Sequence, residues 1–264
     1  MSDSSRSERQ SNDVSRRAKI HIGTSGWHYK HWKGPFYPAD LSPARMLSWY
    51  VERFETVEIN NSFYRLPAES ALASWCRLTP ANFCFAVKAS RYITHNRKLK
   101  NPQNEVERFL TLIDKLGQRL GPILFQLPPA WRVNVDRLDE FLSCLPRGHR
   151  YAFEFRDPTW NVAPVYEVLD RHNAAYCIHE LAGFLSPIQI TADFTYVRLH
   201  GPGNRYQGNY SAATLSRWAE RIERWRNELR HIFVYFDNDQ AGFAPNNALQ
   251  LIKRVAGSGS RRAA

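Results

Sequence analysis

Short apolar runs and amphipathic stretches alternate along most of the chain. The stretches between the runs repeat apolar residues with the period of a helix that buries one face. Because strand and helix alternate eight times, the pattern predicts an α/β domain built as a single (β/α)8 TIM-like barrel, not an open doubly wound sheet. The eight runs are Ile20–Trp27, Thr56–Phe63, Phe83–Ser90, Pro122–Leu127, Tyr151–Arg156, Ala174–Glu180, Phe194–His200 and His231–Asn238.

Capping residues mark the start of four helical stretches. Ser42 followed by Pro43 is typical of a helix start, and Asn104, Asn134 and Ser211 open further helices. The segment between the sixth and seventh runs has little helical periodicity. We therefore expect an irregular barrel, with a reduced helix between strands 6 and 7.

The strands alternate between apolar and polar side chains. In Tyr151–Arg156, for example, Phe153 and Phe155 oppose Glu154 and Arg156. In a barrel the apolar phase packs on the helices and the other phase points inward. The polar residues come late in their strands, so we expect them at the C-terminal mouth, where barrel enzymes place their chemistry. They are Glu58, Asn60, Lys88, Gln126, Glu154, Arg156, His179, Arg198, His200 and Asp237.

These polar residues also have a purely structural interpretation. A barrel interior can hold one satisfied ion pair, such as Glu154–Arg156 or Glu58–Lys88. Ten polar side chains at one end of the barrel are costly for stability alone, because buried polar clusters rarely improve on apolar packing. The pattern therefore favours a functional pocket.

Composition bounds the class of protein. The net charge is +11; residues 1–19 contribute +2 and Arg261 with Arg262 another +2, which leaves +7 on the rest. We expect a disordered polar tail over 1–18, one barrel domain over 19–256 and a flexible tail over 257–264. No run is long enough to span a bilayer and the first 18 residues lack the apolar core of a secretory signal, so we expect a cytoplasmic protein with no membrane partner.

Four scattered cysteines, Cys76, Cys84, Cys144 and Cys177, form no CxxC pair. This pattern favours reduced thiols in the core over disulfides or metal ligands.

Seven motifs in order give the chain a family resemblance. They are Ile22-Gly-Thr-Ser-Gly-Trp27, Glu58-Ile-Asn-Asn-Ser-Phe-Tyr64, Phe85-Ala-Val-Lys88 followed by Thr94-His95, Phe125-Gln-Leu-Pro128, Phe153-Glu-Phe-Arg156 with Trp160, Arg198-Leu-His-Gly201, and Tyr235-Phe-Asp-Asn238 followed by Asn246-Asn-Ala248. In these the chain resembles the YecE-like family, domain of unknown function seventy-two. The resemblance implies a TIM barrel with a polar cavity at the strand C-termini, but no substrate. The chain departs from the family pattern at His179-Glu180-Leu-Ala-Gly183.

The carboxylates at the mouth suggest acid/base chemistry. Glu58 and Glu154 come from different strands, with Asp237 as a third candidate, and two carboxylates in different environments can act as acid and base. Arg156 or Lys88 beside one of them would keep it ionised. We expect these three carboxylates to be the catalytic residues of a hydrolase or isomerase.

Cationic side chains at the same end suggest an anionic ligand. Arg156, Arg198, Lys88 and His200 converge there, and the loop after the third strand adds Arg91, Arg97, Lys98 and Lys100. A charge run is usually a solvated face, but this one lies on the predicted mouth side. The expected ligand is therefore a small phosphorylated, carboxylated or nucleotide-like molecule. The expected binding residues are Asn60, Lys88, His95, Gln126, Arg156, His179, Arg198, His200 and Asn238, with Trp27, Tyr64 and Trp160 as aromatic faces.

Two alternatives remain open from the sequence. Glu58, Glu154, His179, His200 or Asp237 could hold a divalent metal in a hydrolase or isomerase, although the inward arginines and lysine argue against a dense cation site, and no metal or other cofactor is predicted. The other alternative is a non-catalytic protein that binds nucleic acid or a nucleotide through the basic loop and the mouth aromatics.

The substitution Glu154→Gln separates the enzyme from the binding protein. An enzyme should show a thermal shift with small molecules and lose turnover in this variant. A nucleic-acid binder should instead show affinity that falls steeply with salt and changes little in Glu154→Gln. Turnover that survives in both Glu154→Gln and Glu58→Gln would contradict the catalytic assignment.

Overall fold

The computed structural model describes residues 17–260. Most of the two expected tails, 1–18 and 257–264, therefore lies outside the described residues. The described helices include none that is long and apolar enough to cross a membrane.

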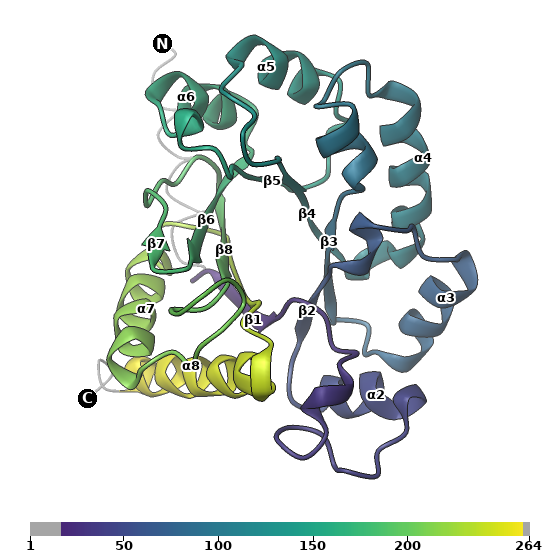
Figure 1. The fold of residues 1–264 in the computed structure, drawn as a ribbon, viewed down its shortest axis with the longest axis vertical. Helices are drawn as coiled ribbons and strands as arrows, with labels where there is room; N and C mark the ends of the chain where they lie inside the picture. The colour runs from purple at the N-terminus through teal and green to yellow at the C-terminus, as the bar shows by residue number, and fades with distance from the viewer. Residues whose placement is uncertain (1–16, 261–264) are drawn as a thin grey trace, which may run out of the picture.

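Eight parallel strands form the wall of the predicted barrel, one in each expected run. Around the ring they follow the order β1, β9, β8, β6, β5, β4, β3 and β2, and Figure 1 looks into this ring with the helices outside it. The TIM-like barrel is thus confirmed. The strands are β1 (Lys19–Thr24), β2 (Thr56–Ile59), β3 (Cys84–Lys88), β4 (Leu120–Gln126), β5 (Tyr151–Glu154), β6 (Ala175–Leu181), β8 (Phe194–Leu199) and β9 (His231–Phe236).

The ring closes at a narrow seam between β1 and β2. One isolated parallel bridge joins Ser25 to Glu58, and the N–H of Gly26 donates to the carbonyl of Glu58 at 2.8 Å. Gly23 allows the close approach of the two strands, because a Cβ at this position would lie 2.3 Å from the carbonyl oxygen of Thr56. The seam therefore depends on a residue with no side chain.

The α-helices of the described residues, α2 to α8, lie outside the ring (Figure 1). Asn134 caps α5 by accepting the N–H of Arg137, and Ser211 caps α7 by accepting the N–H of Thr214, as the sequence predicts. Ser42 precedes a short 3-10 turn, η2 (Pro43–Arg45), which leads into α2. The helices are α2 (Met46–Val51), α3 (Glu69–Leu78), α4 (Gln103–Ile113), α5 (Val135–Ser143), α6 (Ala163–Arg171), α7 (Ala212–Trp225) and α8 (Phe243–Ser260).

The barrel is irregular between β6 and β8, as predicted. No helix occurs between these strands; the chain instead forms β7 (Phe184–Leu185), which pairs with β6 in antiparallel orientation, and continues without regular structure to β8. Phe184, Leu185, Ile188 and Ile190 are partly exposed there. A helix of the outer layer would have covered this side of the ring.

The interior of the barrel changes from apolar to polar along its axis. The part of the interior nearer the N-terminal ends of the strands is filled by an apolar cluster that includes Ala86, Leu124, Ala152, Phe194 and Phe233. The polar residues of the same inward phase follow later in each strand. The apolar core thus supports the polar end from below, and this arrangement positions the candidate site.

The cysteines lie in different environments. Cys84 and Cys177 are buried, whereas Cys76 is half-buried and Cys144 is exposed. The expectation of core thiols is therefore right for Cys84 and Cys177 and wrong for Cys76 and for Cys144, which directly follows α5 as its C-cap. All four are free thiols.

We expect Gly23→Ala to destabilise the protein, because the added methyl group would collide with the backbone of β2 at the seam. Overpacking of this kind costs about 1–3 kcal/mol in the free energy of unfolding, which urea denaturation measures. Gly257→Ala on α8 is the matched control, since the Cβ that this substitution adds would meet no neighbouring atom within 4 Å. Equal stability of the two variants would contradict the close approach at the seam.

Candidate functional site

Arg198, on β8, lies at the centre of the barrel mouth. Its side chain is 1% exposed, and its guanidinium donates to Glu58 from Nε at 2.9 Å and from Nη2 at 2.7 Å. It also donates from Nη1 to Glu154 at 2.8 Å and from Nη2 to Asp237 at 3.0 Å. One cation therefore joins carboxylates from three other strand ends. Burial would lower the pKa of Arg198, but Glu58, Glu154 and Asp237 outweigh it and raise the pKa well above its ordinary value.

The carboxylate of Glu58 is fully enclosed. Oε1 accepts from Arg198 and from the Ser25 hydroxyl, and Oε2 accepts from Arg198 and from the Tyr196 hydroxyl at 2.7 Å. The residue is 0% exposed. Both oxygens of Glu58 are thus occupied within the protein.

Glu154 is equally buried and is held by two arginines. Oε1 accepts from Nε of Arg156 and Oε2 from Arg198. Burial alone would raise the pKa of the Glu154 carboxyl, but Arg156, Arg198 and His200 outweigh it and hold the pKa well below its usual range. Glu154 is therefore ionised at neutral pH.

Asp237 and His200 complete this charge network, which consists of Glu58, Glu154, Arg156, Arg198, His200 and Asp237. Oδ2 of Asp237 lies 3.0 Å from Nδ1 of His200, and Nε2 of His200 lies 3.0 Å from Nη2 of Arg156. Burial would raise the pKa of Asp237, but Arg198 and His200 outweigh it and lower the pKa. No described residue contacts Oδ1 of Asp237 by a hydrogen bond.

Lys88 lies beside the charge network without joining it. It ends β3 and is 6% exposed, and its Nζ lies 4.1 Å from the centre of the Phe63 ring. Within residues 17–260 its amine has no hydrogen bond or ion pair. Burial and, to a smaller extent, the charge of Arg198 lower the pKa of Lys88 to about 8, against the opposing effect of Glu154, Glu58 and Asp237.

Further polar side chains with incomplete hydrogen bonding surround the mouth. Nδ1 of His179 and Oδ1 of Asn60 are buried without a partner. His95 lies on the π-helical turn η4 (Tyr92–Asn96), with its pKa lowered to about 4 by burial and by Lys88 and Arg91. Gln126 is 9% exposed and is the strand neighbour of Glu154. A cavity of about 330 Å³ opens at the rim between Trp27, Tyr29, Asn60 and Tyr64.

Two residues expected to bind the ligand, Trp160 and Asn238, lie behind the mouth, and a third, Trp27, lies only partly at its rim. Trp160 is 0% exposed and its indole N–H donates to the carbonyl of Trp131 at 2.6 Å, so it packs behind the mouth loops. Trp27 packs its ring edge-on against Trp75 of α3, although it also borders the rim cavity. Asn238 is fully buried; its amide donates to the carbonyl of Gly208 at 2.8 Å and to Asn247 at 2.9 Å, so it connects the loop after β8 to α8. Tyr64, by contrast, stands at the rim and is 73% exposed.

Three residues of the mouth have no role in the sequence-based prediction. Two of them, Ser25 and Tyr196, donate hydrogen bonds to Glu58. Tyr206, on the loop after β8, places its ring against His200 with centroids 5.4 Å apart. Tyr196 precedes Arg198 by two residues and so has the same inward phase, a signal that could have identified it. Nothing in the local pattern points to Tyr206.

The donor set does not suit a metal ion. Within the described residues no group of three or more histidine, cysteine, aspartate or glutamate side chains is placed to hold one. Arg198 occupies the position among the three carboxylates where a cation would have to bind. The acidic residues of the mouth therefore already have their cation.

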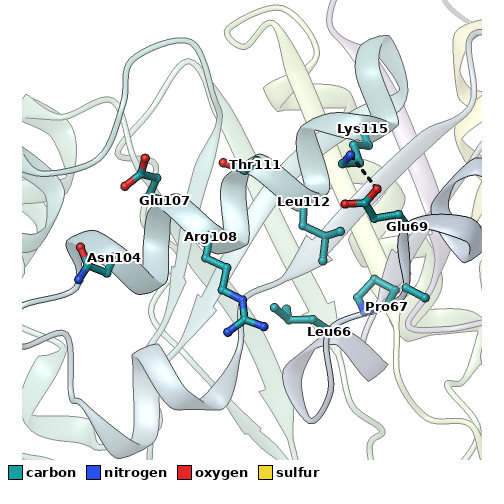
Figure 2. A pocket seen from close by; sticks show the side chains of 10 residues that line it. Leu66, Pro67, Glu69, Asn104, Glu107, Arg108, Thr111, Leu112 and Lys115 are labelled. Carbon is teal, nitrogen blue, oxygen red and sulfur yellow. Dashed lines mark ion pairs between the residues drawn. The ribbon is translucent and has the colours of Figure 1, made fainter.

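The larger cavities lie outside the ring, beside α4. One of about 630 Å³ lies between the segment before α3 and α4, and a second of about 650 Å³ extends it toward Tyr64 and Tyr92. Figure 2 shows Arg108 of α4 extending toward Leu66, with the ion pair between Lys115 and Glu69 at the far side. We name this pair of cavities the α4 groove. It lies apart from the charge network and has no buried charged cluster of its own.

The fold and the mouth together define a class: TIM-like barrels with a buried polar site at the C-terminal ends of their strands. The family model described as protein of unknown function DUF72 matches residues 21–263, and the chain belongs to this family. The resemblance seen in the sequence is thereby confirmed.

Individual relatives agree with this assignment. The chain is 25% identical to the UPF0759 protein YunF of Bacillus subtilis strain 168, over 89% of this chain and 94% of YunF. It is 29% identical to the UPF0759 protein YecE of Escherichia coli strain K12, over 53% of this chain and 49% of YecE. A crystal structure of a DUF72 family protein from Thermotoga maritima MSB8 matches with a TM-score of 0.83 and 29% identity, covering 90% of this chain and 99% of that one.

We expect Arg198→Met to lower the free energy of unfolding by about 3–5 kcal/mol, because it leaves Glu58 buried without a cation and removes one partner each from Glu154 and Asp237. Arg77→Met, on an exposed face of α3, should change it by no more than about 0.5 kcal/mol. Both are measured by chemical denaturation at pH 7. Adding Glu58→Gln should restore part of the loss, since it removes the uncompensated charge. Additive losses in the double variant would contradict a coupled network.

Proposed function

We propose that the protein is an enzyme that binds a small anionic substrate at the barrel mouth and transfers a proton there. The observation that carries the proposal is the environment of the Lys88 side chain. Lys88 is a nearly buried cationic side chain that lies beside a saturated charge network and has no hydrogen-bonding partner within the described chain. An ammonium group in this situation is costly unless a ligand completes its contacts.

The charge distribution supports an anionic ligand. Arg198 and Arg156 are already hydrogen-bonded to carboxylates of the charge network, so the cations outside it near the opening are Lys88 and, at the rim, Arg91. The lowered pKa of His95 reflects both of these cations. A carboxylate or phosphate group between Lys88 and His95 would give the Lys88 amine the hydrogen bond that it lacks within the described residues.

Proton transfer is supported by Asp237 and Lys88. Of the six oxygens on the three carboxylates, only Oδ1 of Asp237 lacks a donor from the described residues. It can therefore accept a proton from a substrate. Lys88, with its pKa lowered to about 8, can donate one near neutral pH. Such a pair suits an isomerisation or a hydrolysis.

This proposal changes the roles first expected for the two glutamates. Glu58 and Glu154 have both oxygens occupied, so a substrate would have to displace an arginine to reach them. We assign them as positioning residues that orient Arg198 and, through Arg156, His200. Asp237 retains the role of proton acceptor.

A second candidate function, binding of single-stranded nucleic acid, is favoured by the α4 groove. Tyr64 is 73% and Tyr92 45% exposed beside it. Arg65 and Arg108 line it, exposed and without an ion pair in the described part of the chain. Flat aromatic faces next to free arginines suit stacked bases and a phosphate backbone.

Ligand-induced thermal shifts test the first proposal. A panel of small carboxylates and phosphates is screened, and a ligand present at a hundred times its Kd should stabilise the wild type by roughly 2.7 kcal/mol, about 5–10 °C in Tm for a domain of this size. Lys88→Met should abolish the shift because it removes the unpartnered cation. Lys253→Met, on the exposed face of α8, should preserve it.

The two candidates give opposite results with polyanions. A mouth site predicts that the shift survives in an Arg65→Ala/Arg108→Ala variant and that oligonucleotides add no salt-dependent stabilisation. Stabilisation by a single-stranded oligonucleotide that disappears in this variant, with no response to any small anion, would favour the nucleic-acid candidate and refute the first.

A further inference from the structure

Lys88 differs from every other lysine in the described chain. Lys19, Lys30, Lys33, Lys98, Lys100, Lys115 and Lys253 are exposed or half-buried, whereas Lys88 is buried at the end of an inward-facing strand phase. Its amine rests on the Phe63 ring at 4.1 Å. An anchor for an anion needs only a charge, and an exposed lysine supplies that at lower cost. The burial of Lys88 requires a further explanation.

The surroundings of Lys88 favour the neutral amine. Proteins activate a lysine nucleophile in two ways: by desolvation in an apolar environment and by placing a second cation nearby. Both occur here, because burial of the side chain against Phe63 disfavours the charged amine and the charge of Arg198 disfavours it further. Lys88 therefore has the environment of a nucleophilic lysine as well as that of an anion ligand.

We propose that Lys88 forms an imine with a small ketone or aldehyde that carries a carboxylate or phosphate group. The inference rests on the proposed function, since it names the substrate class of the same site. Nζ attacks the carbonyl carbon, the carbonyl π bond breaks, and a carbinolamine forms.

The atoms of this step balance without a co-reactant. Asp237, through its free Oδ1, passes the two protons that Nζ loses to the substrate oxygen in turn. The first protonates the alkoxide and completes the carbinolamine, and the second converts its hydroxyl into a leaving water. The C–O bond then breaks, water leaves, and the nitrogen lone pair forms the C=N bond. The sum is amine plus carbonyl giving imine plus water. His95 and Arg91 at the rim lie on the side where the anionic group of the substrate would bind.

Borohydride trapping tests the inference directly. The full-length protein is incubated at pH 8 with pyruvate or with dihydroxyacetone phosphate, a carboxylated and a phosphorylated ketone, and then reduced with sodium borohydride. At this pH a lysine whose pKa is about 8 has about a hundredfold larger neutral fraction than an ordinary lysine of pKa ~10.4. The reduced adduct should therefore appear at Lys88 before any other lysine.

Peptide mapping reads the position of the adduct. Trypsin does not cleave after an alkylated lysine, so the label should appear in a fused peptide, Leu78–Arg91. Lys88→Arg keeps the positive charge but cannot form an imine, and should abolish trapping while keeping the fold, as a melting curve checks. Lys253→Arg should trap as the wild type does.

The failure of this inference differs from the failure of the proposed function. If either ketone stabilises the wild type thermally but neither labels Lys88, the site binds anions and the imine is refuted. Label spread equally over the exposed lysines refutes the imine as well. If small anions and both ketones leave Tm unchanged and no label forms, both the imine and the proposed function fail.

Discussion

A buried guanidinium among three carboxylates is the constraint on which the rest of this structure depends. The guanidinium of Arg198 donates hydrogen bonds to Glu58, Glu154 and Asp237, which come from strands on different sides of the ring. Each of these groups would be costly alone in the interior, and together they are tolerated because every charge has a partner with direct hydrogen bonds. The network therefore needs a rigid ring of strand ends, and the apolar cluster beneath it supplies that support.

The hydrogen bonds within the network leave few polar groups at the mouth without a partner. Groups whose contacts are complete, such as Glu58, contribute orientation and field. Groups whose contacts are incomplete, Lys88 and one oxygen of Asp237, are where a ligand can gain free energy by binding. Charge alone is thus a poor guide to function in a polar barrel interior. The polar groups that lack a hydrogen-bonding partner are a better guide.

The sequence predicted the ring and the height of the polar residues because both follow from local periodicity. The alternation of Phe153 and Glu154, repeated from strand to strand, specifies which side chains point inward, and the weak helical periodicity between the sixth and seventh runs marked the missing helix. It could not predict which inward residues meet, since the bonds of Arg198 to Glu58 and Glu154 join positions 140 and 44 residues apart. Trp160 and Asn238 share their motifs with mouth residues, but their side chains turn into loop packing.

The seam between β1 and β2 connects barrel closure to the electrostatics of the mouth. The carbonyl of Glu58 accepts a hydrogen bond from Gly26, and its carboxylate accepts one from Ser25. Glu58 therefore stabilises the seam through its main chain and the charge network through its side chain. A fluctuation that parted these strands would also admit water to the carboxylates around Arg198. The hydration of these charges and the opening of the seam are therefore coupled. The narrow contact between β1 and β2 is stabilised by the buried charge network beside it.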